Sequence, residues 1–339
     1  MAAAAGQLWA SVDDLVARMP GPNDVASHRV ELFEARSLRS AGAPVPPALV
    51  ERERRAAVGL LCVPVLLRRV RAAYDGSLLI LKGPEVARHY PDHALREYGD
   101  VDLLADDAPR AQAALLKAGF RELGDPARYR DIHHLRPLAW PGLPVVLELH
   151  SRPKWLDGLQ GPSAADVLDR GLPSTVGVDG FLALPCAPHA VLVAVHSWAH
   201  EPLRRLRDLV DVAVLAEASE PDELSAAATE WGVERLWATT AAAVDFLFYG
   251  ERKPLALRVW GQNVAAGRER TVLENHLQRW LSDLWALPPH RALARMPRTL
   301  REELWPKGET WRRKLSRTAL AVRNAFTRRS EHDREFAAR

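Results

Sequence analysis

Hydrophobic and polar positions repeat with two periods along this chain, and the change of period separates a central segment with strands from flanking helices. Apolar residues recur every three to four positions in residues 1–73 and again from residue 188 to residue 287, which is the period of amphipathic helices. We expect two short helices before the proline-rich residues 43–47 and one long helix over residues 47–73. Shorter apolar runs have the length and composition of strands, namely residues 78–82, 101–105, 133–140, 145–151 and 176–184.

The central segment predicts a small mixed sheet. A short helix begins at Pro84, and an amphipathic helix covers residues 107–118 and stops at Gly119. A turn at residues 140–143 joins the two strands around it as a hairpin. The order strand, helix, strand, helix, strand, strand is typical of an α+β fold with helices on one side of the sheet.

Shifts in composition divide the chain into four expected units. An N-terminal helical segment covers residues 1–75, and the sheet covers residues 76–184. A helical domain covers residues 185–305, and a tail covers residues 306–339.

The tail is basic and amphipathic. It holds ten Lys or Arg and four Asp or Glu, a net charge of +6, so the rest of the chain carries −3 of the total +3. One helical stripe consists of Trp311, Leu315, Thr318, Val322 and Phe326. Such a helix lies on an anionic membrane or a nucleic acid, or docks its stripe on the domain and leaves its arginines in water. We favour the docked arrangement.

The overall composition is that of an ordinary folded protein, with 47% hydrophobic and 26% charged residues among 339. Its two cysteines, Cys62 and Cys186, fit neither a disulfide framework nor a metal site, so we expect the reducing cytoplasm. No apolar run approaches the roughly 20 residues of a transmembrane helix. The N-terminus lacks the pattern of a signal peptide.

Three acids in apolar strands are the candidate chemistry. Asp100 and Asp102 are two positions apart, so both carboxylates point to one face of a strand while Val101 and Leu103 face the core. Glu148, in a second apolar strand, completes a candidate set of three. Neighbouring carboxylates repel each other unless a cation lies between them, and magnesium prefers such oxygen ligands.

Several short motifs together resemble one protein family. They are Lys82-Gly83, Gly99-Asp100-Val101-Asp102, Leu147-Glu148-Leu149-His150 and Leu206-Arg207-Asp208-Leu209, with Arg96 after the first and His196 and His200 before the last. In this order they resemble the uncharacterised nucleotidyltransferase family of the DNA-polymerase-β-like nucleotidyltransferase superfamily, over about residues 27–306.

The resemblance implies a palm-like sheet that binds a nucleoside triphosphate, such as ATP, with two magnesium ions or with manganese. Three carboxylates hold the metal ions in the superfamily, and Asp100, Asp102 and Glu148 match them as metal ligands and catalytic residues. The implied reaction moves a nucleoside monophosphate to a hydroxyl group and releases pyrophosphate. Two ions hold the attacking and leaving oxygens, and Glu148 is also a candidate base for the acceptor hydroxyl.

Candidate nucleotide-binding residues surround the acids. Gly83 and Gly99 allow a close approach of the backbone, and Lys82 and Arg96 supply positive charge to a triphosphate. The wider superfamily has Gly-Ser or Gly-Gly where this chain has Lys82-Gly83. Lys82 has an alternative role as the partner of a structural carboxylate, and the phosphate role is favoured.

Histidines and arginines near these motifs have open roles. His150 and Arg152 share the strand face of Glu148 and reach either a substrate or the acids themselves. His196 and His200 have a zinc-compatible spacing but no third ligand, so we expect a cap or a contact with the base. Arg207 and Asp208 form an ion pair or touch the nucleotide, and the structural role is favoured.

Two function classes remain at this stage. The first is a transferase whose acceptor is a small molecule, a sugar or a peptide side chain, with an RNA 3′ end as a variant supported only by the basic tail. The second is a non-catalytic nucleotide-binding or interaction protein on the same fold, which needs the set of three acids to be broken or blocked and gains support if their carboxyl groups do not converge. A P-loop enzyme or a protein kinase is disfavoured because neither glycine-rich signature occurs.

Overall fold

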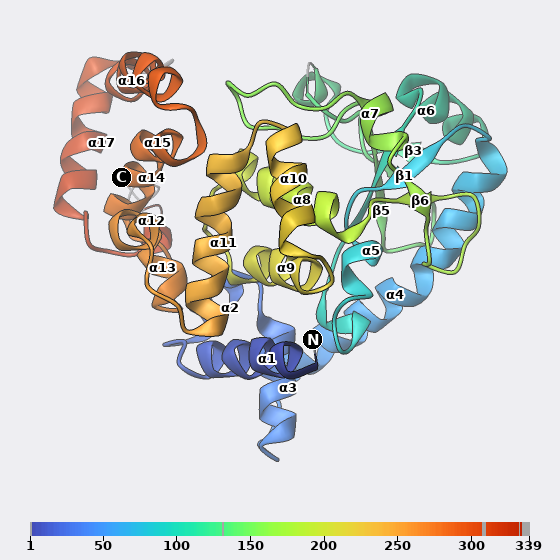
Figure 1. Ribbon diagram of the computed structural model, residues 1–339, viewed down its shortest axis with the longest axis horizontal. Coiled ribbons are helices and arrows are strands. Elements are labelled where there is room, and N and C mark those ends of the chain that lie inside the picture. Colours follow the sequence, from blue (N-terminus) through green and yellow to red (C-terminus); the bar gives the residue numbers. More distant parts are fainter. Residues whose placement is uncertain (1, 131, 307–309, 332, 334–339) are drawn as a thin grey trace.

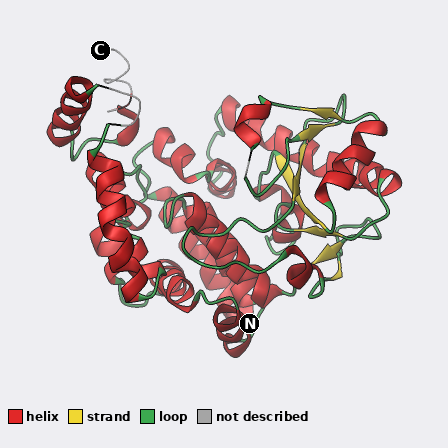
Figure 2. Cartoon of the chain, turned by 90° about the horizontal axis from the view of Figure 1, so that it is seen from above, coloured by secondary structure: helices red, strands yellow, loops and turns green. Residues whose placement is uncertain are grey.

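The computed structural model describes residues 2–130, 132–306, 310–331 and 333 (Figure 1). Figure 2 shows the strands gathered on one side of the molecule, with helices making up the rest. The N-terminal helices are α1 (Ala2–Ala17), α2 (Pro22–His28), α3 (Glu31–Ser40) and α4 (Pro47–Ala73). The long helix therefore has its predicted bounds, whereas residues 1–46 contain three helices where two were predicted.

Seven strands in the described part of the chain form one mixed sheet, in the order β3-β4-β5-β2-β1-β7-β6. Their bounds are β1 (Leu78–Ile80), β2 (Asp100–Ala105), β3 (Arg121–Glu122), β4 (Leu138–Ala139), β5 (Val146–His150), β6 (Leu172–Pro173) and β7 (Leu182–Ala183). The central strand β2 is antiparallel to β1 and parallel to β5, and β4 and β5 form the predicted antiparallel hairpin. The α+β class and the mixed sheet are confirmed.

Short helices lie between the strands of the sheet segment, and all of them except α5 begin after a residue whose side chain caps the helix. They are α5 (Pro84–Ala87), η1 (His93–Leu95), α6 (Ala108–Lys117), η2 (Pro126–Tyr129) and α7 (Ala164–Leu168). Asp107 caps α6 by accepting a hydrogen bond from the amide of Arg110 at 3.0 Å.

The alternation of side chains along the strands gives the sheet two different faces. Ile80, Val101 and Leu103 face a core that includes Leu66 and Leu115 from the helices α4 and α6. The opposite face contributes residues such as Leu79 and Leu104 to a second, larger core with the helical half of the chain. Asp102, between Val101 and Leu103, therefore points to the helical half, as predicted from the period of two.

The helical half follows β7. Its helices are α8 (Cys186–His200), α9 (Leu206–Glu217), α10 (Pro221–Glu230), α11 (Glu234–Tyr249), α12 (Leu255–Val259), α13 (Gln262–Ala265), α14 (Val272–Leu281), α15 (Asp283–Ala286), α16 (Pro289–Leu304) and α17 (Trp311–Arg323). The helices predicted over residues 254–266 and 271–287 are each divided in two, and α16 was not predicted. No helix among the described residues combines the length and apolar character that crossing a bilayer requires.

The first three helices pack with the helical half. Leu8, Val12 and Phe33 are buried in the core that α8, α9 and α11 also build, whereas α4 packs against the sheet. The segment predicted as one N-terminal unit, residues 1–75, is thus shared between two cores.

The prediction that the tail docks its apolar stripe is wrong. Trp311, Leu315, Val322 and Phe326 are 51%, 64%, 72% and 84% exposed. The inward side of α17 instead buries Lys314 and Leu320, and residues 307–309, 332 and 334–339 of the tail lie outside the described residues.

Candidate active site

Strand register brings the acids of two distant segments together. β2 and β5 run parallel with Asp102 paired to Glu148 and Leu104 paired to His150. Side chains at paired positions of neighbouring strands point the same way. As a result, ligand atoms of Asp102, Glu148 and His150 all lie within 4.8 Å of one another.

Asp102 and His150 are almost fully enclosed, each with 1% of its surface exposed. The contacts of the Asp102 carboxylate are specific. Its Oδ1 lies 2.9 Å from Nε2 of His150, and its Oδ2 lies 3.2 Å from Nζ of Lys82. Burial alone raises the pKa of the Asp102 carboxyl, but Lys82 and His150 favour the carboxylate more strongly, so the net pKa is well below its usual value. Asp102 is therefore a permanent buried anion.

The pKa of the Glu148 carboxyl is shifted in the opposite direction. Burial, together with the charges of Asp102 and Asp100, raises the pKa of the Glu148 carboxyl from 4.5 to about 7. Its Oε2 is 3.9 Å from Nε2 of both His134 and His150. Accumulated negative charge of this kind favours a bound cation.

A pocket of about 480 Å³ opens beside this cluster, between the sheet and the helices α8 and α9. It is lined by Asp100 and Asp102, by Gly83 and Gly99, and by side chains from the helical half. Asp100 is half-buried and is not one of the three residues that converge within 4.8 Å, although it lines the same pocket. Gly83 has a φ of 67°, a backbone conformation that favours glycine.

Lys82 connects the two halves of the pocket. Its Nζ lies 3.2 Å from the Asp102 carboxylate and 3.1 Å from Nε2 of His196 on α8. Burial and the charge of Lys82 lower the pKa of the His196 imidazole well below its usual value, so His196 is neutral. The pairing of Lys82 with a carboxylate, the alternative role in the sequence analysis, is present, and Lys82 also lines the pocket.

Arg96 is held by a partner that the sequence analysis did not identify. Its guanidinium donates two hydrogen bonds of 2.8 Å to the buried carboxylate of Asp211 on α9, to which Tyr90 also donates. A third hydrogen bond reaches the carbonyl of Gly83 at 3.3 Å. The charge of Arg96 is thus balanced within the protein, and its clearest effect is to fix the turn at Gly83.

Of the remaining predicted site residues, His150 lies with the acids and Arg152 lies outside the pocket. His150 is buried against Asp102, one of the two roles left open for it, and its Nδ1 has no hydrogen-bond partner among the described residues. Arg152 lies beyond the end of β5, is exposed, and is not among the residues that line the pocket.

Three arginines at the pocket were missed or left with an open role. Arg29 ends α2 in the left-handed backbone conformation, with φ of 56°, and Arg205 and Arg207 lie at the start of α9. Burial and the charges of Arg207 and Arg205 lower the pKa of the Arg29 guanidinium. Arg207 donates to the carbonyl of Glu97 at 2.9 Å, and its Nε is buried without a hydrogen-bond partner in the described part of the chain.

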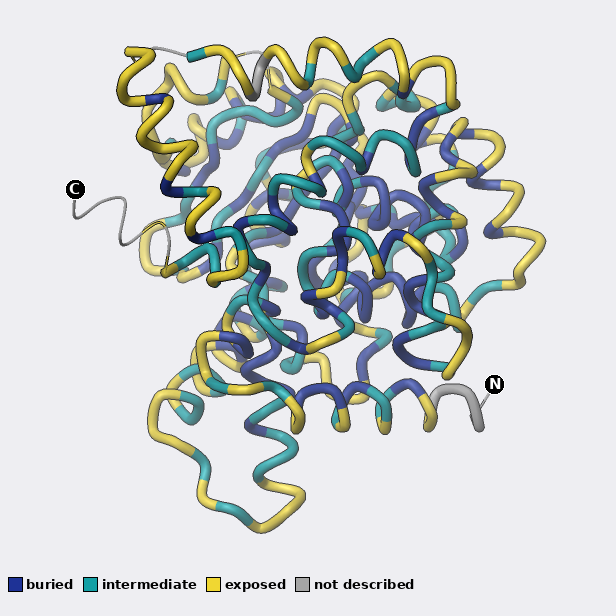
Figure 3. The backbone as a smooth tube through the Cα atoms, turned by 90° about the vertical axis from the view of Figure 1, so that its left-hand side faces the viewer, coloured by how far each residue is buried: buried dark blue, intermediate teal, exposed yellow. Residues whose placement is uncertain are grey.

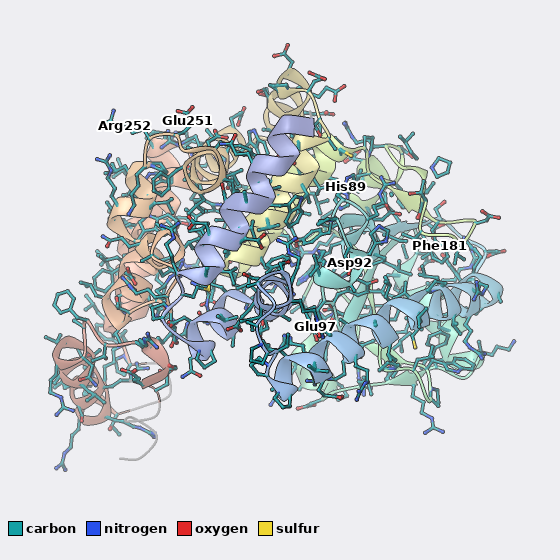
Figure 4. The ribbon with its side chains drawn as sticks, turned by 90° about the horizontal axis from the view of Figure 1, so that it is seen from below. His89, Asp92, Glu97, Phe181, Glu251 and Arg252 are labelled. Carbon is teal, nitrogen blue, oxygen red and sulfur yellow. The ribbon has the colours of Figure 1, made fainter. Side chains whose placement is uncertain are left out.

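On the side toward α4, the pocket is lined by Glu97, which is labelled in Figure 4. Arg52 of α4 pairs with Glu97 at 2.6 Å and with Glu31 at 2.8 Å. Arg52 is therefore neutralised. Lys82 is paired with Asp102 and Arg96 with Asp211, so the arginines Arg29, Arg205 and Arg207 remain against Asp100 and Asp208 and give the pocket a small excess of positive charge.

A second group of basic side chains flanks Glu148. Lys154 lies 2.8 Å from the ring of His200, and burial followed by the charge of Lys82 lowers the pKa of the Lys154 ammonium to about 8. The ring centroids of His133 and His134 are each 5.3 Å from that of His150. No sequence motif points to Lys154, since only the folded chain brings it to the site.

The donor set fits a hard divalent cation. Asp102 and Glu148 offer carboxylate oxygens, and the pKa of Glu148 is raised first by burial and then by the charges of Asp102 and Asp100. His150 adds a nitrogen, which manganese accepts more readily than magnesium.

Comparison with known protein families identifies one that covers most of the chain. A sequence model of the family described as "Uncharacterised nucleotidyltransferase" matches residues 25–248, more than half of the 339 residues. The matched segment contains Arg29, the whole sheet and the start of α9, and thus every wall of the pocket described above. No curated protein matches the chain.

Proposed function

The chain belongs to the uncharacterised nucleotidyltransferase family, and from this premise we propose that it moves a nucleoside monophosphate from a triphosphate such as ATP to a hydroxyl acceptor, releasing pyrophosphate. Family membership makes the chain an enzyme of the nucleotidyltransferase class. The observation that carries the finer proposal is the convergence of Asp102 and Glu148 beside a basic pocket.

Asp102, Glu148 and Asp100 are the residues that would hold the divalent metal. Magnesium or manganese bound there would neutralise triphosphate charge and polarise the reacting phosphorus centre. Asp102 keeps its charge because Lys82 and His150 hold its carboxylate. Asp100 extends the acidic face of β2 toward the open pocket, which suits a second ion.

The triphosphate is proposed to lie along Lys82, the Gly83 and Gly99 backbone, and the arginines Arg29, Arg205 and Arg207. Guanidinium groups make strong charge-assisted hydrogen bonds to phosphate oxygens. Arg96 supports this site indirectly, because its own charge is taken by Asp211. Arg152 has no part in the proposal.

Glu148 is the proposed proton acceptor for the attacking hydroxyl. A carboxyl whose pKa is about 7 exchanges protons readily at neutral pH. As the proton moves to Glu148, the ammonium of Lys154 would stabilise the negative charge that develops on the attacking oxygen.

Transfer of label from each of the four nucleoside triphosphates, with magnesium and a panel of small-molecule, sugar, peptide and RNA acceptors, tests the proposal. Asp102→Asn is expected to lower transfer by at least about 100-fold. Asp75→Asn is a matched control, because the Asp75 side chain is 86% exposed at the start of the sheet segment. Full transfer by Asp102→Asn, or no labelled product from the native enzyme with any acceptor, would contradict the proposal.

A further inference from the structure

The apolar surface of this protein is concentrated at its C-terminal end. Eight large hydrophobic side chains that are at least 42% exposed lie between α16 and the end of the described chain: Leu293, Leu300, Leu304, Trp305, Trp311, Leu315, Val322 and Phe326. The other seven exposed large hydrophobic residues are spread over the remaining chain. Large contiguous apolar patches on a folded protein mark interaction sites.

Helical geometry aligns these side chains. Leu293, Leu300 and Leu304 are spaced by seven and four positions on α16, and Trp311, Leu315 and Val322 by four and seven on α17, so each set forms one stripe. The indoles of Trp305 and Trp311 pack edge to face at 5.3 Å and join the two stripes. Figure 3 shows α17 exposed along most of its length on the side of the molecule that faces the viewer.

The part of this surface that contains α17 carries one sign of charge, whereas α16 holds Glu302 and Glu303 beside its arginines. Between Thr310 and Ser330 there are seven Lys or Arg and no Asp or Glu. Arg328 pairs with Asp24 at 2.8 Å and Arg329 with Glu201 at 3.0 Å, which attaches the segment to the rest of the molecule. Arg312 and Arg313, beside Trp311, are exposed to solvent.

We propose that α16, α17 and the residues up to Phe326 form a surface that binds an anionic lipid bilayer. Exposed Trp, Phe and Leu side chains partition into the boundary between headgroups and acyl chains, while neighbouring arginines meet anionic headgroups. The aliphatic side chains Leu293, Leu315 and Val322 have no favourable role against the phosphates of a nucleic acid. A second copy of the chain is opposed by like charge, because the exposed Arg312 and Arg313 of the two copies would meet.

The binding surface is separate from the pocket of the proposed transferase. α17 lies at the edge of the molecule far from the sheet (Figures 1 and 2). The groove between α14 and α17, of about 520 Å³ and lined by Trp280, Leu304 and Val322 among others, continues the apolar surface inward. Membrane binding would thus leave the pocket open to substrates.

Flotation of the full-length protein with vesicles tests the inference. We expect binding to vesicles of phosphatidylcholine with phosphatidylglycerol, and at least tenfold weaker binding to phosphatidylcholine alone or at high salt. Leu315→Ser with Phe326→Ser should weaken binding about tenfold or more. Leu61→Ser with Leu255→Ser is the matched control, since these side chains are 74% and 61% exposed elsewhere, and it should bind as the native protein does.

Three results would overturn the inference. The first is no flotation of the native protein with anionic vesicles. The second is equal loss of binding in the matched control. The third is binding to RNA, or self-association measured by light scattering, that Leu315→Ser with Phe326→Ser abolishes while vesicle binding is absent. Circular dichroism of both double variants establishes that the exposed substitutions leave the fold intact.

Discussion

At the scale of single residues, the contrast between Asp102 and Glu148 is the central property of the site. Both are acids on the same face of the sheet, one with a pKa well below its usual value and the other with a pKa of about 7. Burial raises the pKa of both carboxyl groups, but Asp102 has Lys82 and His150 within hydrogen-bond distance to offset it, whereas the charges of Asp102 and Asp100 raise the pKa of Glu148 further. One acid is thus a fixed anion, and the other takes up and releases a proton.

Glu148 should make the stability of the metal-free protein depend on pH. Its folded-state pKa of about 7 lies above the ordinary 4.5, so its contribution is fully present below 4.5 and is lost as the pH rises through about 7. Glu148→Gln should remove this loss, on the order of 2 kcal/mol between about pH 5 and about pH 8. Urea denaturation with a chelator at both pH values measures it.

The same measurement of stability against pH, repeated with magnesium, tests whether Glu148 binds the ion. If the carboxylate binds the ion, excess magnesium should flatten the pH dependence of the native protein and leave that of Glu148→Gln unchanged. If the free energy of unfolding changes with pH equally in the metal-free native protein and in Glu148→Gln, the Glu148 carboxyl has its ordinary pKa in the folded protein.

Arg29 gives the clearest test of the phosphate site. Arg29→Ala is expected to weaken binding of inorganic triphosphate about tenfold or more, because a charge-assisted hydrogen bond to phosphate is lost. Arg152→Ala should leave binding unchanged, since Arg152 is outside the pocket. Isothermal titration of both variants compares them, and equal affinities would remove Arg29 from the site.

At the scale of elements, the pair Arg96–Asp211 ties the segment before β2 to α9. Both side chains are about 5% exposed, and the two residues are 115 positions apart. The pair determines the separation of the two pocket walls, because Arg96 also holds the carbonyl of Gly83.

Asp211→Asn should lower the free energy of unfolding by about 3–5 kcal/mol, because it leaves the buried charge of Arg96 without its partner. Arg39→Ala, at the exposed pair with Glu53 on α3 and α4, should have a much smaller effect. Thermal and urea unfolding of the two variants make the comparison. Equal losses would mean that the buried pair does not stabilise the junction.

Local patterns predicted the elements of this protein better than they predicted its site. The period of two placed Asp102 on the face away from Val101 and Leu103, and the apolar stripe with its prolines gave α4 its bounds. In the sequence analysis, Arg96 was assigned to phosphate. Its ion-pair partner Asp211 lies far along the chain, and no local sequence pattern indicates that the two residues meet. Arg29 belongs to no motif in the sequence, because its neighbours show only the pattern of a helix. The packing of the folded chain places it at the pocket.

The exposed stripe of α17 shows another limit of pattern reasoning. The sequence identified the amphipathic helix correctly, and an amphipathic helix in a soluble protein usually turns its apolar face inward. The period of a helix defines its faces but not which of them meets the protein. The structure buries Lys314 and Leu320 and leaves Leu315 outside.

At the scale of the whole molecule, two cores meet on opposite faces of one sheet. α1 supplies Leu8, Val12, Leu15 and Val16, each at most 6% exposed, to the larger core. The N-terminal helices are therefore part of the helical half, and Arg29 reaches the pocket because of that packing.

Deletion of residues 1–20 should expose the faces of α9 and α11 that contact α1. Loss of these four buried side chains, at about 1.5–3 kcal/mol each, removes stabilisation comparable with the whole stability of a typical domain. We expect a shortened protein that is aggregated or sensitive to limited proteolysis. A soluble, protease-resistant product with native circular dichroism would mean that α1 is dispensable.

The walls of the pocket come from residues that begin at Arg29 and end at Asp211. During synthesis the ribosome must therefore release more than half of the chain before any substrate finds a complete binding surface. Since chains fold as they emerge, we expect the sheet to form before its ligand has a complete binding surface. Cellular substrate levels would then influence how long the finished enzyme survives, rather than how efficiently it is made.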